Sequence, residues 1–292
     1  MNSRETPHRG DTSTFNCNRE DSGMPADDEF FGSPHRVALA KRSASLWALL
    51  RHDPRYSYYG RLVALSEPGQ DTADILTAIA TLQGAAVSYF YPADAAASLL
   101  GQLEARGLAT DRHEHYRGGE AAFAAGRRAL EQIVLPADLC ICTIDPGTPR
   151  ELVAEVADLC EACDVMPVPG SVMRARACTG ICLVATDRNG RPVATASSYM
   201  IHHPSSPRAK DAFWGMLATR HDRRGERIAL LLGAQAIIHM WERHGARGFM
   251  TGVRAENTSS QALCNKLGIT RTNWIYASCI NQAMFDGTSI TK

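Results

Sequence analysis

Hydrophobic positions change their spacing from segment to segment along the chain, and this predicts alternating helices and strands from Val37 onward. Residues 1–35 differ, because charged residues, Ser, Thr, Gly and Pro dominate there and aliphatic side chains are nearly absent. Such a segment cannot bury enough apolar surface to offset the entropy of ordering. We therefore expect residues 1–35 to form a flexible tail.

The segment 36–135 predicts an N-terminal α/β domain, because helical and strand-like spacing alternate within it. Turn and stop signals divide the segment, among them Glu67-Pro68-Gly69, Gly84 and Gly107. The expected helices cover residues 37–51, 72–83, 92–106 and 120–133. The expected strands cover residues 60–65, 85–91 and 108–116.

A second domain is expected over residues 136–292, after the helix stop at Pro136. Its clearest local signal is Asn189-Gly190, which predicts a hairpin between two strands. The expected strands cover residues 139–144, 181–185, 193–201, 212–219, 249–253 and 274–280. The expected helices cover residues 149–163, 225–244 and 258–267. This order predicts a mixed sheet with α+β or α/β layers.

Net charge and hydropathy indicate which kinds of partner the chain is not expected to bind. The 292 residues contain 31 Lys+Arg and 31 Asp+Glu, so the formal net charge is zero. This balance argues against nucleic acid or an anionic membrane as a chain-wide partner. No run approaches the roughly 18 apolar residues of a membrane span, and the first residues lack the apolar core of a signal peptide. We expect a cytoplasmic protein with no nucleic-acid or membrane partner.

Six of the nine cysteines lie between positions 140 and 182, a density that a zinc or redox site would also produce. Cys140 and Cys142 share one face of an expected strand, and Cys160 and Cys163 continue the apolar face of an expected helix. Small buried thiols fit those positions. We therefore expect reduced core cysteines and no bound metal.

Four arginines crowd the start of the long helix expected over residues 225–244. Arg220, Arg223, Arg224 and Arg227 lie there, although a helix N-terminus already carries partial positive charge. Cations at this position are favoured when an anion binds, and free backbone N–H groups with a nearby glycine suit a phosphate. The alternative is a solvated basic turn paired with acidic neighbours. We favour the anion site.

Two motifs at this point resemble the GNAT superfamily of acyl-CoA-dependent N-acyltransferases, over roughly residues 138–285. Residues 224–229, RGERIA, are similar to the Arg/Gln-x-x-Gly-x-Gly/Ala turn that holds the CoA pyrophosphate in that family, except that Arg227 replaces the central glycine. Residues 257–268, NTSSQALCNKLG, are similar to the family's Asn-x-x-Ser-x-x-Leu-Tyr-x-x-Leu-Gly helix, except that Cys264 replaces the tyrosine. The resemblance implies a mixed-sheet GNAT fold for the C-terminal half.

The resemblance also implies a function. The chain would transfer an acyl group, most simply acetyl, from acetyl-CoA or another acyl-CoA directly to an amine of a small molecule or peptide. A catalytically weak CoA-binding module is the alternative, because of Arg227 and Cys264. The residues that the family would use for the cofactor and the carbonyl oxygen are Met216, Leu217, Ala218, Arg223, Arg224, Gly225, Glu226, Arg227, Ile228, Ala229 and Asn257.

The proton-transfer residues are less clear from the sequence. The thiol leaving group has a pKa of about 8.5 and needs little assistance, so Cys264, Tyr276 or water could protonate it. The attacking amine must be neutral, and His202 is a candidate base, as are His203, Asp211, Glu256 or a water chain. Adjacent strand residues point to opposite faces, so only one of the two histidines can face a given cleft.

Two features bear on what the N-terminal half does. Its expected strand, helix, glycine and strand over residues 85–116 repeat the order of residues 249–280, which suggests a degenerate GNAT-like unit or a chance likeness of α/β order. The helix over residues 228–241 is apolar nearly all round, so we expect it to be covered on both sides. The sheet covers one side, and the N-terminal half or the second subunit of a homodimer covers the other.

Overall fold

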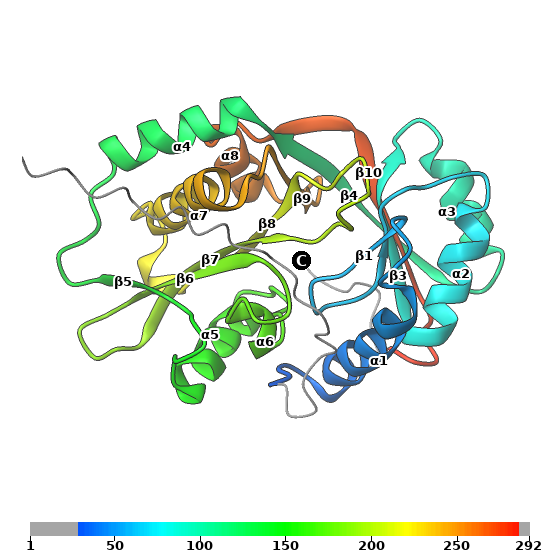
Figure 1. Ribbon diagram of the computed structural model, residues 1–292, viewed down its shortest axis with the longest axis horizontal. Helices are drawn as coiled ribbons and strands as arrows, with labels where there is room; N and C mark the ends of the chain where they lie inside the picture. Colours follow the sequence, from blue (N-terminus) through cyan, green and yellow to red (C-terminus); the bar gives the residue numbers. More distant parts are fainter. Residues whose placement is uncertain (1–28, 286–292) are drawn as a thin grey trace, which may run out of the picture.

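The computed structural model describes residues 29–285, and within them the strands form a single sheet (Figure 1). The spatial order is β1-β2-β3-β10-β4-β9-β8-β7-β6-β5. The strands are β1 (Tyr56–Ser57), β2 (Ala64–Leu65), β3 (Ala85–Pro92), β4 (Ala109–Gly118), β5 (Cys140–Thr143), β6 (Gly180–Thr186), β7 (Pro192–Met200), β8 (Asp211–Thr219), β9 (Gly248–Val253) and β10 (Thr270–Ile280).

Helices cover both faces of this sheet (Figure 1). They are α1 (Pro34–Leu50), α2 (Thr72–Gln83), α3 (Ala96–Glu104), α4 (Glu120–Gln132), α5 (Arg150–Ala162), α6 (Gly170–Met173), α7 (Ile228–His244) and α8 (Thr258–Lys266). A 3-10 turn, His221–Arg223, connects β8 to the approach of α7. The expected helices and strands are present, most with shifted ends, whereas β1 and α6 were not expected from the sequence.

Three buried apolar clusters hold the layers together. One packs α5, α6 and part of α1 against the sheet, a second packs α4, α7 and α8 against the opposite face, and a third lies between α2, α3 and the strands β3 and β10. Burial of this apolar surface is the main favourable term in folding. The C-terminal strand β10 is therefore part of the core of the N-terminal half.

The two predicted domains exchange strands at the centre of the sheet. β10 pairs antiparallel with β3 and with β4, and β4 pairs antiparallel with β9. Strands from both sides of Pro136 thus alternate in space, in the order β3-β10-β4-β9. Any site beside these strands is built from both halves of the chain.

The N-terminal half repeats part of the C-terminal connectivity. β2 and β3 are parallel and joined by α2, as β8 and β9 are parallel and joined by α7. A second helix and strand follow in each case, α3 with β4 and α8 with β10. The repeated order seen in the sequence is thus a repeated connectivity in the structure.

Helix α4 provides the second cover that the apolar helix α7 requires. Phe123 of α4 stacks on Trp241 of α7 with ring centroids 4.9 Å apart. Gly126 of α4 approaches Ile238 so closely that an added Cβ would lie 3.4 Å from it. The N-terminal half therefore covers α7, and the homodimer stays a prediction.

Two predictions from the sequence need correction, one for the cysteines of β5 and one for the expected tail. Cys140 and Cys142 are exposed, so the prediction of buried thiols was wrong for them, because β5 is an edge strand with little covering it. The last residues of the expected tail take part in the fold, since the Glu29 carboxylate lies 3.1 Å from Nε of Arg174. Residues 1–28 of that tail lie outside the described residues.

Among residues 29–285, no helix has the length and apolar character needed to cross a membrane. The same residues contain no cluster of three or more His, Cys, Asp or Glu side chains suited to a metal ion.

Candidate functional site

Strands β8 and β9 separate as they leave the sheet's centre. Their parallel pairing runs only from Asp211 and Gly248 to Phe213 and Met250. Beyond it, one extra residue interrupts the pairing of β8 with β7, and Met216 adopts a positive φ of 52° there. A bulge of this kind bends a strand and redirects its backbone groups. The two strands therefore form an open wedge.

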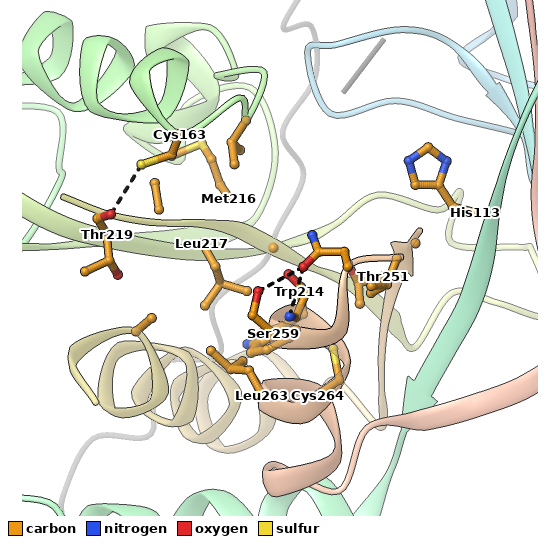
Figure 2. A pocket seen from close by; sticks show the side chains of 18 of the residues that line it. His113, Cys163, Trp214, Met216, Leu217, Thr219, Thr251, Ser259, Leu263 and Cys264 are labelled. Atoms are coloured by element: carbon orange, nitrogen blue, oxygen red, sulfur yellow. Dashed lines mark hydrogen bonds between the residues drawn. The ribbon is translucent and has the colours of Figure 1, made fainter. Parts of the chain in front are cut away.

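A cavity of about 560 Å³ occupies this wedge. Figure 2 shows the His113 imidazole near the space bordered by Met216, Leu217 and Thr251, with Leu263 and Cys264 of α8 below it. The cavity wall includes β8, the start of α7, β9 and α8, together with Tyr59, Arg61, Tyr89 and His113 from the N-terminal half. Both halves thus contribute to one site.

The start of α7 forms one end of the cavity. Arg227 is the N-cap residue and adopts the left-handed conformation, with φ 63° and ψ 14°. That conformation favours glycine, which is the residue that the resembling motif has at this position. Gly225 also has a positive φ, 89°, and a Cβ there would meet no atom within 4 Å. Arg227 therefore preserves the backbone shape of the motif, and its side chain is exposed.

The first turn of α7 leaves backbone N–H groups without partners inside the helix. These groups and the positive end of the helix dipole suit a phosphate. Gly225, Arg227, Ile228 and Ala229 line the cavity at this turn. The local geometry therefore fits the pyrophosphate of a CoA ester.

The four arginines divide into two pairs. Arg220 lies 2.7 Å from Asp222 and 3.2 Å from Asp187. Arg223 lies 2.6 Å from Glu226 and 2.8 Å from Asp138. The hydrogen bond from Arg223 lowers the pKa of the Glu226 carboxyl. The interpretation as a solvated turn thus describes these two arginines, although Arg223 still lines the cavity.

Arg224 and Arg227 are the other pair. In the range 29–285 neither forms an ion pair, and the Arg224 Nε donates a hydrogen bond to the carbonyl oxygen of Thr219, at 3.4 Å. Both residues line the cavity. They are the two guanidinium groups available for an anionic ligand at this end.

Asn257 lies at the cavity wall and also begins α8. Its side-chain oxygen accepts hydrogen bonds from the Ser260 N–H at 3.1 Å and from the Ser259 hydroxyl at 3.0 Å. This is the usual pattern of a helix N-cap. Asn257 therefore shapes the wall by fixing the start of α8.

Cys264 and Tyr276, the candidate proton donors, both line the cavity. Burial raises the pKa of the Cys264 thiol to about 12. Burial also raises the pKa of Tyr276 well above its ordinary value. The Tyr276 hydroxyl has no hydrogen-bond partner among the described residues. Both groups hold their protons at neutral pH, and the tyrosine hydroxyl is open to a ligand.

The structure does not bring the candidate base His202 to this cavity. Its Nδ1 lies 2.8 Å from the Ser66 hydroxyl, and burial lowers the pKa of the imidazole to about 4. The alternatives are also placed elsewhere, since Asp211 binds Arg117 at 2.6 Å and Glu256 lies 3.6 Å from Arg254 on the surface. None of the three belongs to the cavity lining.

His113 is the cavity histidine that the sequence analysis did not identify. It lies on β4 directly opposite Tyr276 of β10, so the two side chains project from the same face of the sheet. The Asp111 carboxylate lies 4.0 Å from its Nδ1 and is itself held by Arg254 at 2.6 Å. A period-2 Asp-x-His pattern in a strand was the available signal.

Comparison with known proteins agrees with this architecture. Residues 153–269 match the model of the acetyltransferase (GNAT) family. The C-terminal half has the GNAT fold. The turn into α7 and the helix after Asn257, which carry the two motifs, both lie within the matched residues.

One solved structure shares the fold at low sequence identity, and a second is similar over most of the chain. A GCN5-related N-acetyltransferase-like protein from Streptococcus suis 89/1591 is 19% identical, with 77% of this chain and 81% of that chain covered and a TM-score of 0.50. A GCN5-related N-acetyltransferase from Kribbella flavida is 13% identical, with 84% and 95% covered and a TM-score of 0.49. No curated protein sequence matches the chain significantly.

Proposed function

We propose that this protein transfers an acyl group from an acyl-CoA, most simply acetyl-CoA, directly to an amine. The observation that carries the proposal is the continuity of one cavity from the start of α7 to the side chains of His113 and Tyr276. A phosphate-binding end and a pair of proton-transfer groups are thereby joined along the wedge between β8 and β9.

In this proposal the start of α7 holds the CoA phosphates. The backbone N–H groups near Gly225 to Ala229 donate to the pyrophosphate, and Arg224 and Arg227 add two charges that no carboxylate in residues 29–285 neutralises. The pantetheine arm then runs between the separated strands toward the bulge at Met216.

The bulge supplies the oxyanion site. A backbone N–H within Met216 to Ala218 points at the thioester carbonyl oxygen, which gains negative charge as the amine attacks. The positive φ at Met216 is the strain that redirects this part of β8. A preformed donor of this kind needs no reorganisation during the reaction.

Two protons must move during the transfer. His113 removes the proton of the acceptor ammonium, and the neutral amine nitrogen forms a bond to the carbonyl carbon. The carbon–sulfur bond breaks as the nitrogen loses its second proton. The CoA thiolate takes a proton from the Tyr276 hydroxyl, from Cys264 or from water, and the second nitrogen proton restores that donor. Asp111, 4.0 Å from the Nδ1 of His113, is too distant for a hydrogen bond but stabilises the imidazolium that forms.

The test is the release of free CoA thiol from acetyl-CoA in the presence of a panel of amines, amino acids, aminoglycosides and peptides. We expect release that depends on both the acceptor and the protein, with the acetylated amine detected by mass spectrometry. Binding of acetyl-CoA without release would support the CoA-binding module. Neither binding nor release would contradict both functions.

A further inference from the structure

Arg61 is a buried cation that the proposed acyl transfer does not use. It lies in the connection between β1 and β2, is 6% exposed, and lines the cavity. Its Nη1 donates a hydrogen bond to the Tyr59 hydroxyl at 3.3 Å. Its guanidinium carbon lies 5.4 Å from the centre of the Tyr59 ring and 5.6 Å from that of Phe213.

The remaining donors of this guanidinium are open. In the part of the chain that the structure describes, Nε and Nη2 of Arg61 have no hydrogen-bond partner, and no carboxylate forms an ion pair with it. Contact with aromatic faces offsets only part of the cost of burying a charge. An anion in the cavity would satisfy both the charge and the open donors.

The two open atoms form the edge of the guanidinium that binds carboxylates side-on. Arg117 uses its Nε and Nη2 to hold both oxygens of Asp211, at 3.0 and 2.6 Å. Arg223 uses the same two atoms on Glu226, at 2.6 and 2.8 Å. This paired geometry is specific for planar, two-oxygen groups. The open edge of Arg61 therefore favours a carboxylate.

The position of Arg61 separates it from the CoA phosphates. Arg61 contacts Phe213, whereas the bulge begins at Met216 and the turn into α7 follows Thr219. At about 3.3 Å per strand residue, the Cα of Phe213 lies about 10 Å from the bulge and about 20 Å from the end of β8, and its ring folds back over Gly215, next to the bulge. Along β8 the order is thus phosphate end, thioester position, Arg61, which puts Arg61 on the acceptor's side.

We propose that Arg61 binds a carboxylate of the amine acceptor, so that the acceptor is an amino acid or a related amino carboxylate. This inference rests on the proposed acyl transfer. The carboxylate binds the Nε and Nη2 edge, and the amine then lies between Arg61 and the thioester position, near His113. A carboxylate on the acyl group of a dicarboxylic acyl-CoA is the other source of the same chemistry.

The test compares amino acids with their carboxamides, in which a neutral amide replaces the carboxylate. With acetyl-CoA, we expect kcat/KM to be about 100-fold higher for the best amino acid than for its amide. In Arg61→Gln this preference should fall below about 5-fold, and Arg61→Lys should restore part of it. A preference that is unchanged in Arg61→Gln, or equal losses for both acceptors, would overturn the proposal.

Arg208→Gln is the matched control. Arg208 also stacks on aromatic rings, 4.2 Å from the centre of Phe90 and 4.8 Å from that of Trp274, but it does not line the cavity. We expect Arg208→Gln to keep the wild-type preference for the amino acid. The melting temperatures of all variants show whether each is folded before the kinetics are compared.

Two further measurements separate a carboxylate on the acceptor from one on the acyl group, and carboxylate binding from acyl transfer. Succinyl-CoA is compared with acetyl-CoA on a simple alkylamine, and dependence of the succinyl preference on Arg61 would assign the carboxylate to the acyl group and overturn the acceptor assignment. Thermal stabilisation by the twenty amino acids and their amides needs no turnover. Stabilisation by the acids alone, lost in Arg61→Gln, would support the carboxylate site even if acyl transfer were absent.

Discussion

The unit β2-α2-β3 and the unit β8-α7-β9 share a connectivity but differ where the helix begins. Helix α2 has Asp71 at its N-cap and Asp74 in its first turn. Helix α7 has no acidic residue in its first turn, and Arg227 is its N-cap. Carboxylates at a helix N-terminus stabilise it and repel phosphate, whereas the start of α7 is open to an anion.

The two units also differ in the space beside their parallel strands. In the N-terminal unit, the His202 Nδ1 lies 2.8 Å from the Ser66 hydroxyl, next to β2, and its ring centroid lies 5.8 Å from that of Phe90 on β3. Side chains thus fill that place. In the C-terminal unit the corresponding space belongs to the cavity. The same connectivity therefore gives a ligand site only where the helix start and the wedge are both open.

The N-terminal half nevertheless provides His113, on β4, and replacing it should have the largest effect. We expect His113→Gln to lower kcat by about 10²- to 10⁴-fold, because a positioned general base contributes that much. Affinity for acetyl-CoA should stay within about twofold, since His113 lies away from the phosphate end. His239→Gln, a change on the outer part of α7, is the control. Unchanged kcat in His113→Gln would remove the base from the mechanism.

The filled space of the N-terminal unit predicts acid sensitivity. Burial lowers the pKa of His202 to about 4 and that of His115 to about 3. In the unfolded chain both imidazoles accept protons below about pH 6.5, so the stabilisation is complete above that pH and is lost as pH falls toward 4. We expect each to remove about 2 kcal/mol of unfolding free energy between pH 7.5 and 5.0.

Urea unfolding at the two pH values measures this loss. His202→Gln should reduce the difference between the two free energies by about 2 kcal/mol. His52→Gln, a change at an exposed position, should leave the difference as in the wild type. Equal pH dependence of wild type and His202→Gln would show that His202 is protonated in the folded protein at pH 5.

Two arginines near the start of α7 allow a matched comparison, because Arg224 lines the cavity and Arg220 does not. Arg224→Gln should raise the dissociation constant of acetyl-CoA by about tenfold, because a charge-assisted hydrogen bond to phosphate is lost. Arg220→Gln should change it less than twofold, because Arg220 binds Asp187 and Asp222 and does not line the cavity. Isothermal titration calorimetry measures both constants. Equal effects would mean that the arginines act only through net charge.

The smallest expected effect concerns the helix after β9. Asn257→Ala removes the acceptor for the Ser260 N–H and should lower the unfolding free energy by about 1 kcal/mol. Asn257→Ser keeps a capping oxygen and should recover most of that loss. Chemical denaturation compares the variants. A large loss of acetyl-CoA affinity in the serine variant would instead indicate direct contact between Asn257 and the ligand.

Much of the local structure could be predicted from the sequence. Helix α2 has the predicted bounds, because Asp71 and the left-handed Gly84 mark its ends. The turn into α7 was found because Arg224, Gly225 and Ala229 keep the spacing of the motif. The exposed Cys140 was mispredicted, since a strand's face does not reveal that the strand lies at the edge of a sheet.

The composition of the site could not be predicted in the same way. The position of β10 between β3 and β4 depends on pairing between residues far apart in the chain, which leaves no local pattern. His113 enters the cavity only because β4 pairs with β9 and β10. Arg61 lies in the strand expected over residues 60–65, and the local pattern does not reveal that its guanidinium is buried beside the cavity. The candidate bases were therefore taken from the C-terminal half, whereas the histidine that lines the cavity lies in the N-terminal half.

The stoichiometry of acetyl-CoA binding tests the contrast between the two units most directly. Calorimetric titration should give one site per chain, weakened about 100-fold or more in Arg224→Glu, because charge reversal replaces attraction by repulsion at the phosphates. At 100-fold excess over the dissociation constant, the wild type should gain about 2.7 kcal/mol of stability. No binding, two sites per chain, or unchanged affinity in Arg224→Glu would contradict a single site at the start of α7.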